Sequence, residues 1–164
     1  MDPSPPPLTL LEALPPHLAA AYQAVCDRIA SFPHVVIAYS GGVDSALVAA
    51  LAVDLLGDAA LAITGVSPAL APHLRQEARD QARWLGLTHR EVSTAELADP
   101  AYTENPQDRC YACKRELHGL LAPLAAALPG AVVLDGVNRD DRSEEHTSEL
   151  QSHSDLVCRL LLEK

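Results

Sequence analysis

Apolar residues follow two different spacings along this chain, and the two spacings alternate. Short β-branched runs at 35–39, 60–66, 88–93 and 131–134 predict buried strands. Recurrence every three or four positions predicts helices at 17–31 and 72–85, and from 109 to about 124. The stretch 45–56 is apolar nearly all round, which predicts a helix pressed into the core. Strands that alternate with helices pair in parallel through right-handed crossovers. The pattern therefore predicts an α/β fold, a Rossmann-like parallel sheet with helices on both faces.

The predicted first strand runs directly into the loop Ser40-Gly41-Gly42-Val43-Asp44-Ser45, and a helix follows at once. Two glycines allow close backbone approach, and successive N–H groups at a helix N-terminus attract an anion. Ser40 and Ser45 add hydroxyl donors, whereas Asp44 would reach phosphate through Mg²⁺. The loop lacks the lysine of the Walker pattern and the third glycine of the dinucleotide fingerprint. The alternative is an ordinary glycine turn with Asp44 or Ser45 capping the helix. We favour a phosphate-binding loop.

Further polar residues follow two other predicted strands at their carboxyl ends, where ligands bind in such sheets. Ser67 follows the second strand and offers backbone groups to an adenine or ribose. The stretch Asp135-Gly136-Val137-Asn138-Arg139-Asp140-Asp141 follows the fourth. We expect Gly136 and Asn138 to line the nucleotide site, and Asp140 and Asp141 to hold Mg²⁺. The alternative is a solvated turn with Asn138 in a left-handed conformation.

Two cysteines, Cys110 and Cys113, open the last predicted helix beside Arg109, Lys114 and Arg115. Positive charge and a helix N-terminus favour the thiolate form. Thiolates at this spacing suit zinc, an iron–sulfur cluster or thiol exchange, and a metal would need further ligands from elsewhere. Buried structural thiols are the alternative.

The predicted helix over 72–85 carries mixed charges that indicate a solvated face, and we expect Trp84 at its end to be a packing residue. The chain as a whole has 164 residues and a net charge of −10, which argues against a broad nucleic-acid surface. It contains no apolar run long enough to span a membrane and no basic leader before an apolar stretch. These observations predict a cytoplasmic protein with a small-molecule partner and no membrane partner.

The loop over residues 40–45 matches, letter for letter, the pyrophosphate loop of the PP-loop ATP pyrophosphatases, which have an adenine nucleotide alpha hydrolase-like fold. Three segments together resemble, in order and spacing, the LarE sulfur transferases of that superfamily. They are 40–45, 135–141 and the most specific one, Asn105-Pro106-Gln107-Asp108-Arg109-Cys110-Tyr111-Ala112-Cys113-Lys114.

The resemblance implies that ATP adenylates a carboxylate of a pyridinium biscarboxylate mononucleotide, releasing pyrophosphate, and that sulfur then replaces AMP in nickel-pincer cofactor synthesis. It implies ATP and Mg²⁺ as cofactors, Asp44 and Ser45 as catalytic residues, and a homo-oligomer when full length. It further implies that Cys110 and Cys113 belong to a 4Fe-4S site whose third cysteine is missing here. The rivals are an amidotransferase-linked synthetase of the NAD or GMP synthase kind, a tRNA thiolase, and a non-catalytic nucleotide- or metal-binding module.

The resemblance ends at Asp141, where the family pattern continues with a Tyr-Arg-Pro-Gly segment. This chain instead becomes rich in Ser, Glu and His, and the string resembles translated sequencing-adapter DNA. We therefore expect three parts: a flexible proline-rich lead-in over 1–16, an incomplete ATP-binding domain over 17–141, and a non-native tail over 142–164. In that case His146, His153 and Cys158 are not metal ligands.

Overall fold

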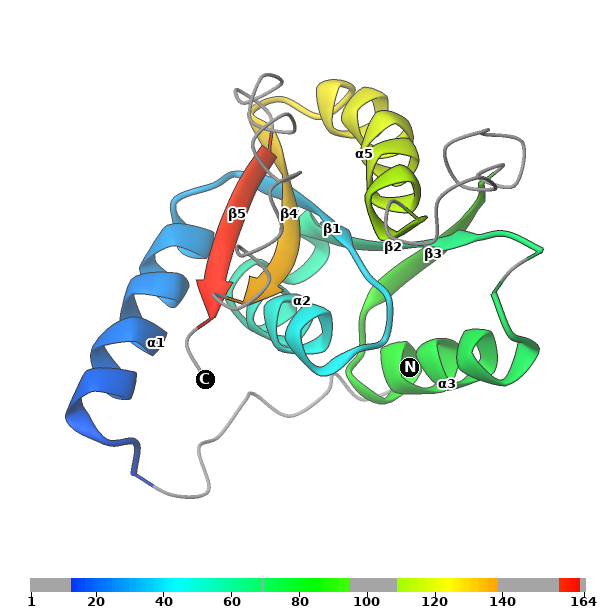
Figure 1. Ribbon diagram of the computed structural model, residues 1–164. Helices are drawn as coiled ribbons and strands as arrows, with labels where there is room; N and C mark the ends of the chain where they lie inside the picture. The colour runs from blue at the N-terminus through cyan, green and yellow to red at the C-terminus, as the bar shows by residue number, and fades with distance from the viewer. Residues whose placement is uncertain (1–12, 69, 95–108, 139–156, 163–164) are drawn as a thin grey trace, which may run out of the picture.

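Five parallel strands form one sheet in the computed structural model, which describes residues 13–68, 70–94, 109–138 and 157–162. The strand order is β3-β2-β1-β4-β5 (Figure 1). The bounds are His34–Ala38 for β1, Ala60–Val66 for β2, Thr88–Ser93 for β3, Ala131–Asn138 for β4 and Val157–Leu162 for β5. Val36 at the centre of β1 pairs with Leu61 on one side and Val133 on the other. The predicted α/β class with a parallel sheet is confirmed.

The helices cover both faces of this sheet: α1 spans Pro16–Ala30, α2 Val43–Leu56, α3 Pro72–Trp84 and α5 Arg109–Ala126, with a short 3₁₀ turn at Gly57–Ala59. Successive strand side chains point to opposite faces, so β1 contributes to two cores. Val35 and Ile37 pack with α1, α2 and α3, whereas Val36 and Ala38 pack under α5. Right-handed crossovers explain this division, because the chain moves from β1 outward to β3 and then crosses back to β4.

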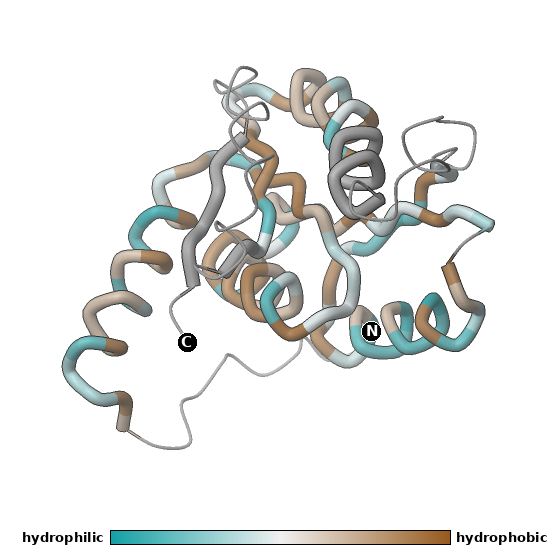
Figure 2. Tube along the Cα trace, viewed as in Figure 1, coloured by the Kyte–Doolittle hydropathy of each residue, from teal (hydrophilic) through white to brown (hydrophobic). Residues whose placement is uncertain are grey.

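Helix α2 lies in the middle of one layer and is apolar on nearly every side, as its sequence predicts. Figure 2 shows it largely brown, in contrast to the teal stretches of α3. Its buried residues are mostly small, which lets the helix approach β1 and β4 closely; they are Ser45, Val48, Ala49, Ala50, Leu51 and Ala52. Burying a side chain such as Leu51 contributes about 1.5–3 kcal/mol. The packing of α2 therefore fixes the position of its N-terminus relative to the carboxyl ends of the strands.

Three features differ from the sequence-based expectation. Strand β4 continues through Asn138, so Asp135 and Gly136 belong to the strand and Asn138 is not in a left-handed turn. Trp84 was expected to pack, but 80% of its surface is exposed at the end of α3. A fifth strand, β5, lies within 142–164 and pairs with β4.

The lead-in up to residue 12 lies outside the described residues, and the division of the chain at residues 16 and 141 stays a prediction. Within the described parts of the chain, no helix is both long enough and apolar enough to cross a membrane.

Candidate functional site

The loop between β1 and α2 has the backbone shape that its glycines suggest. Gly41 has a φ of +81°, a region that residues with a Cβ rarely enter. A Cβ added there would also lie 3.0 Å from the Cβ of Ala78 in α3. Gly42 is the N-cap of α2, and no side chain caps that helix end. Neither Asp44 nor Ser45 is therefore the N-cap residue, and no side chain of the cap residue bonds the first amides of α2.

The two loop serines brace the turn from inside. Ser45 is 6% exposed, and its hydroxyl donates to the carbonyl of Gly42 at 3.0 Å. The same Oγ accepts from the amide of Ser40 at 3.3 Å and lies 3.1 Å from the Ser40 hydroxyl. The Ser40 hydroxyl in turn accepts from the amide of Gly42 at 3.3 Å. These bonds close a small ring between the end of β1 and the first turn of α2, so the loop is preorganised.

Strand β4 reaches this loop from the other side. Asp135 is in register with Ala38, the last residue of β1. At the next residue, Gly136, an added Cβ would lie 2.7 Å from both the carbonyl carbon of Asp44 and the amide nitrogen of Ser45. The chain reverses its winding direction between β1 and β4, and ligands bind at such a switch point. Gly136 thus allows the strand to touch the loop, and this is the role that the structure gives it.

A buried pair that the sequence analysis missed lies on the opposite face of β4. His118 of α5 is 9% exposed and Asp135 is 8% exposed, and Nε2 of the imidazole lies 3.4 Å from Oδ2 of the carboxylate. The available signal was spacing, because His118 falls in line with Leu121 and Ala125 on the stripe that faces the sheet.

The remaining predicted residues are distributed unevenly. Ser67 is 7% exposed just after β2, whereas Val43 at the start of α2 is 75% exposed. Asn138 is the last residue of β4. Cys110 and Cys113 lie in the first turns of α5, a crossover helix that runs antiparallel to the strands and so begins near their carboxyl ends (Figure 1). Asp140 and Asp141 lie outside the described residues.

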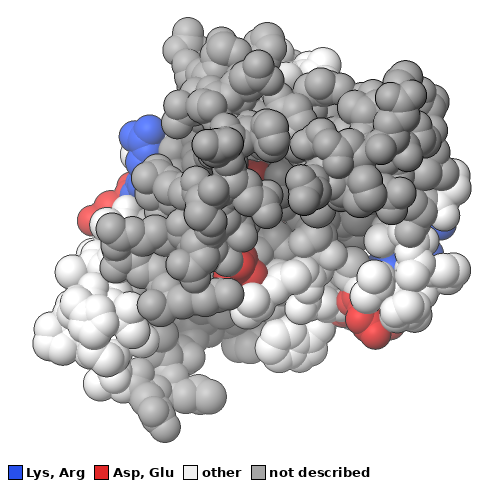
Figure 3. Space-filling model, viewed as in Figure 1, with Lys and Arg blue, Asp and Glu red and all other residues white. Residues whose placement is uncertain are grey.

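The described residues offer few groups for a metal ion. On the face drawn in Figure 3, the described Lys, Arg, Asp and Glu residues form only small separate groups. Among the described residues, no group of three His, Cys, Asp or Glu side chains could hold a metal ion. Asp44, in the first turn of α2, is the loop carboxylate that would hold a Mg²⁺ ion if one binds beside the loop.

The parallel sheet, the glycine loop and the switch point define a nucleotide-binding α/β protein. The family model described as NAD synthase matches residues 22–112, more than half of the chain, and the chain therefore belongs to that family. The resemblance to the LarE enzymes is also confirmed. Pyridinium-3,5-bisthiocarboxylic acid mononucleotide synthase of Lactiplantibacillus plantarum is 28% identical over 148 residues, which is 90% of this chain and 53% of that protein.

Two further proteins are similar to this chain. An uncharacterized protein of Synechocystis sp. is 58% identical over 105 residues, 64% of this chain and 39% of its own length. The NH₃-dependent NAD synthetase of Campylobacter jejuni shares the fold with a TM-score of 0.63 at 21% identity, over 76% of this chain and 58% of that one. The chain thus spans between about two fifths and half of the length of the two curated relatives.

Proposed function

We propose that this chain is the nucleotide-binding part of an ATP-dependent sulfur transferase that acts on a pyridinium biscarboxylate mononucleotide. The observation that carries the proposal is the braced, uncapped loop of residues 40–45, with the backbone of Gly136 pressed against its helix end. Such a loop presents backbone amides to a pyrophosphate group. The 28% identity to the Lactiplantibacillus plantarum synthase supports the choice of acceptor.

In the proposed first step a substrate carboxylate oxygen attacks the α-phosphorus of ATP. The bond to the β-phosphate breaks, and pyrophosphate leaves. The amides at the start of α2 would hold the departing pyrophosphate, and Asp44 would be the residue that holds Mg²⁺ beside it. Ser45 keeps the loop closed by donating to the carbonyl of Gly42, and Ser40 exchanges its hydrogen bond to the Ser45 hydroxyl for one to phosphate when the nucleotide binds. Ser67, Val43 and Asn138 stand as proposed contacts of the rest of the nucleotide.

In the proposed second step a sulfur nucleophile attacks the activated carbonyl carbon, and AMP leaves. Adenylation makes this substitution feasible because AMP is a far better leaving group than oxide. Cys110 and Cys113 begin the helix that starts near the nucleotide edge, which suits them as ligands or carriers of that sulfur. A 4Fe-4S cluster held there would supply the sulfur as a bound sulfide. The cluster would need a third cysteine in addition to these two. We also propose that Asp140 and Asp141 help to hold Mg²⁺.

A second candidate is amidation of a carboxylate in the manner of the NAD synthetases. The family match over residues 22–112 and the Campylobacter jejuni fold favour it. Both candidates share adenylation and differ only in the nucleophile, nitrogen or sulfur. We also propose a small-molecule rather than nucleic-acid substrate, which the net charge of −10 supports. A cytoplasmic site of action, where thiols stay reduced, and a homo-oligomeric full-length enzyme complete the proposal.

The test has two stages: nucleotide binding on the purified chain, and turnover on a full-length version, because we expect the incomplete domain to be inactive alone. Calorimetry with MgATP measures binding, and Asp44→Ala should weaken it while Gly119→Ala, a change at an open helix position, should not. Pyrophosphate release is then measured with three acceptors: the pyridinium biscarboxylate mononucleotide, a NAD synthetase substrate with ammonia, and tRNA. Release only with the first acceptor is expected. Release only with the second would establish amidation instead, and release only with tRNA would overturn both.

A further inference from the structure

Tyr39 is the last residue before the nucleotide loop, and its main-chain carbonyl lies where β1 separates from β2. The regular pairing of these strands ends at Ala38 and Ile63, and the amide of Tyr39 still donates to the Ile63 carbonyl at 2.8 Å. The Tyr39 carbonyl instead accepts from the hydroxyl of Thr64 at 2.7 Å. Thr64 is 4% exposed. Its hydroxyl therefore satisfies the Tyr39 carbonyl, in place of water or of an amide from the neighbouring strand.

The Thr64 hydroxyl has one proton, and the bond to Tyr39 uses it. The same oxygen lies 2.8 Å from Nε2 of His89 on β3, and this contact can form only if Nε2 carries a hydrogen and donates. Burial lowers the pKa of His89, and Arg79 lowers it further while Glu91 opposes both. The imidazole is therefore neutral near pH 7 and fixed in its Nε2–H tautomer.

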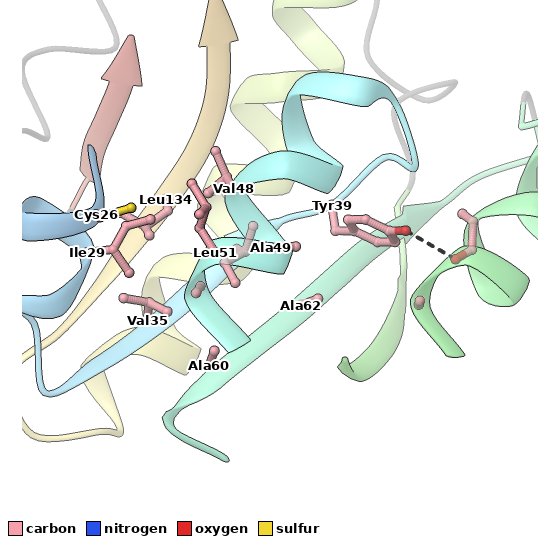
Figure 4. Packing of buried hydrophobic residues seen from close by; sticks show 14 residues of the cluster. Cys26, Ile29, Val35, Tyr39, Val48, Ala49, Leu51, Ala60, Ala62 and Leu134 are labelled. Carbon is pink, nitrogen blue, oxygen red and sulfur yellow. Dashed lines mark hydrogen bonds between the residues drawn. The ribbon is translucent and has the colours of Figure 1, made fainter. Parts of the chain in front are cut away.

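The side chain of Tyr39 is held by the same region. Its ring meets the His89 ring edge-on, with centroids 5.5 Å apart. Its hydroxyl donates to Oε1 of Gln81 at 2.5 Å and lies 3.4 Å from the carbonyl of Ala78, the contact drawn as a dashed line in Figure 4. Burial raises the pKa of Tyr39 to about 12, so the hydroxyl stays a donor. A Cβ added at Gly41, two residues on, would lie 3.0 Å from the Cβ of the same Ala78.

Helix α3, which receives these contacts, is itself clamped to β3. Arg75 and Arg79 each form two hydrogen bonds with the Glu91 carboxylate, at 2.6–3.0 Å. The predicted solvated face of this helix is present, since both arginine side chains are still 39% exposed, but their guanidinium groups are bound to Glu91. The clamp, the Tyr39 hydroxyl bonds and the Thr64–His89 pair together fix the start of the loop from the β3 side of the sheet.

We infer that Thr64 and His89 are positioning residues for nucleotide binding, although neither belongs to the loop. Thr64 holds the Tyr39 carbonyl, and His89 holds Thr64, so the orientation of the peptide that leads into Ser40 depends on a side chain two strands away. The inference rests on the proposed function, because it assigns these residues to the binding of MgATP by the same loop.

The experiment compares Thr64→Val, which keeps the shape but loses the hydroxyl, with Thr64→Ser, which keeps the hydroxyl. Ile63→Val is the control for loss of buried volume, because Ile63 is the neighbouring residue of β2 and its side chain packs in the core under α5. We expect Thr64→Val to weaken MgATP binding about tenfold or more, because an unpaired buried carbonyl is costly and the loop must shift to hydrate it. Thr64→Ser and Ile63→Val should stay within about twofold of the original chain. His89→Phe, which keeps the ring and loses the N–H, should weaken binding by a smaller factor.

A second readout does not depend on nucleotide. Long-range proton–nitrogen spectra report which imidazole nitrogen carries the proton. His89 should be wholly the Nε2–H tautomer in the original chain and mixed in Thr64→Val. Equal MgATP affinity in Thr64→Val and the original chain, or equal losses in Thr64→Val and Ile63→Val, would overturn the inference. If Thr64→Val does not fold, unchanged affinity in His89→Phe would overturn it. Failure of the original chain to bind MgATP would instead remove the proposed function, and an Nδ1–H tautomer would refute the hydrogen-bond assignment by itself.

Discussion

Gly136 of β4 lies so close to Asp44 of α2 that a Cβ on the glycine would stand 2.7 Å from the Asp44 carbonyl carbon and 2.8 Å from its oxygen. The atoms nearest to such a Cβ all belong to the backbone, so no flexible side chain could move aside to make room for it. It joins the end of β4 to the loop that follows β1, at the point where the sheet reverses its winding. The geometry of the loop therefore depends on a residue more than ninety positions away in the sequence.

Replacement of Gly136 by alanine should push the first turn of α2 away from β4. Overpacking of this kind costs about 1–3 kcal/mol of unfolding free energy. MgATP affinity should fall as well, because the displaced residues carry the loop amides. Urea denaturation and calorimetry measure the two effects.

The matched control is Gly119→Ala in α5, where an added Cβ meets nothing within 4 Å. It should stabilise the helix by up to about 1 kcal/mol and leave affinity unchanged. A Gly136→Ala chain as stable and as tight-binding as the original would show that the contact relaxes without cost.

The clamp on Glu91 predicts a defined acid sensitivity. The hydrogen bonds from Arg75 and Arg79 lower the pKa of Glu91 from 4.5 to about 2. A lowered pKa means that the stabilisation is complete above about pH 4.5 and is lost as the pH falls toward 2. Glu91→Gln should therefore lower the free energy of unfolding by about 1–2 kcal/mol at pH 7, a value reduced by solvent screening.

The difference between Glu91→Gln and the original chain should shrink in urea titrations stepped from pH 7 to pH 3. Asp80→Asn is the control, because its pair with Arg83 is largely exposed and should contribute nothing measurable. A gap that stays constant over this pH range would mean that the carboxylate charge is not what holds α3.

Local periodicity was sufficient to predict the framework of this protein. The run over 35–39 followed by the loop and helix carries its own strand, turn and helix signals, and the structure contains all three. The end of β4 was harder, because Asp135 interrupts the apolar run and looks like a turn residue. In the fold its carboxylate is paired with His118, a partner seventeen positions earlier, so the strand continues.

Contacts between distant elements were not predictable in the same way. Thr64 and His89 each look like ordinary polar positions in strands, and only the parallel register of β2 and β3 brings them together. The exposure of Trp84 also depends on tertiary structure, since helical spacing alone does not say where a layer ends. What the sequence identified was the residue types that form the loop, and what it missed was the set of side chains that hold the loop in place.

The His118–Asp135 pair should behave as a coupled unit. His118→Leu removes a buried partner of the carboxylate and should lower the free energy of unfolding by about 1–3 kcal/mol. Asp135→Asn should cost less, because the amide keeps an acceptor oxygen. A double-mutant cycle from urea denaturation should give a coupling energy of about 0.5 kcal/mol or more. Additive effects of the two changes would mean that the 3.4 Å approach carries no energy.

Substitution of Asp44 distinguishes a structural role of this residue from a chemical one. It lies in the first turn of α2, but the N-cap is Gly42 and no side chain caps the helix. Asp44→Ala should leave the fold largely intact, with a cost of about 1 kcal/mol from the lost interaction with the helix dipole. MgATP turnover of the full-length enzyme should disappear, because Asp44 is the carboxylate proposed to hold Mg²⁺ at the phosphates. Circular dichroism and urea denaturation check the fold, and pyrophosphate release checks turnover, with Asp54→Ala at the far end of the same helix as the control. If Asp44→Ala unfolds while Asp54→Ala does not, then Asp44 is a structural residue and the loop must recruit its magnesium ligand from elsewhere.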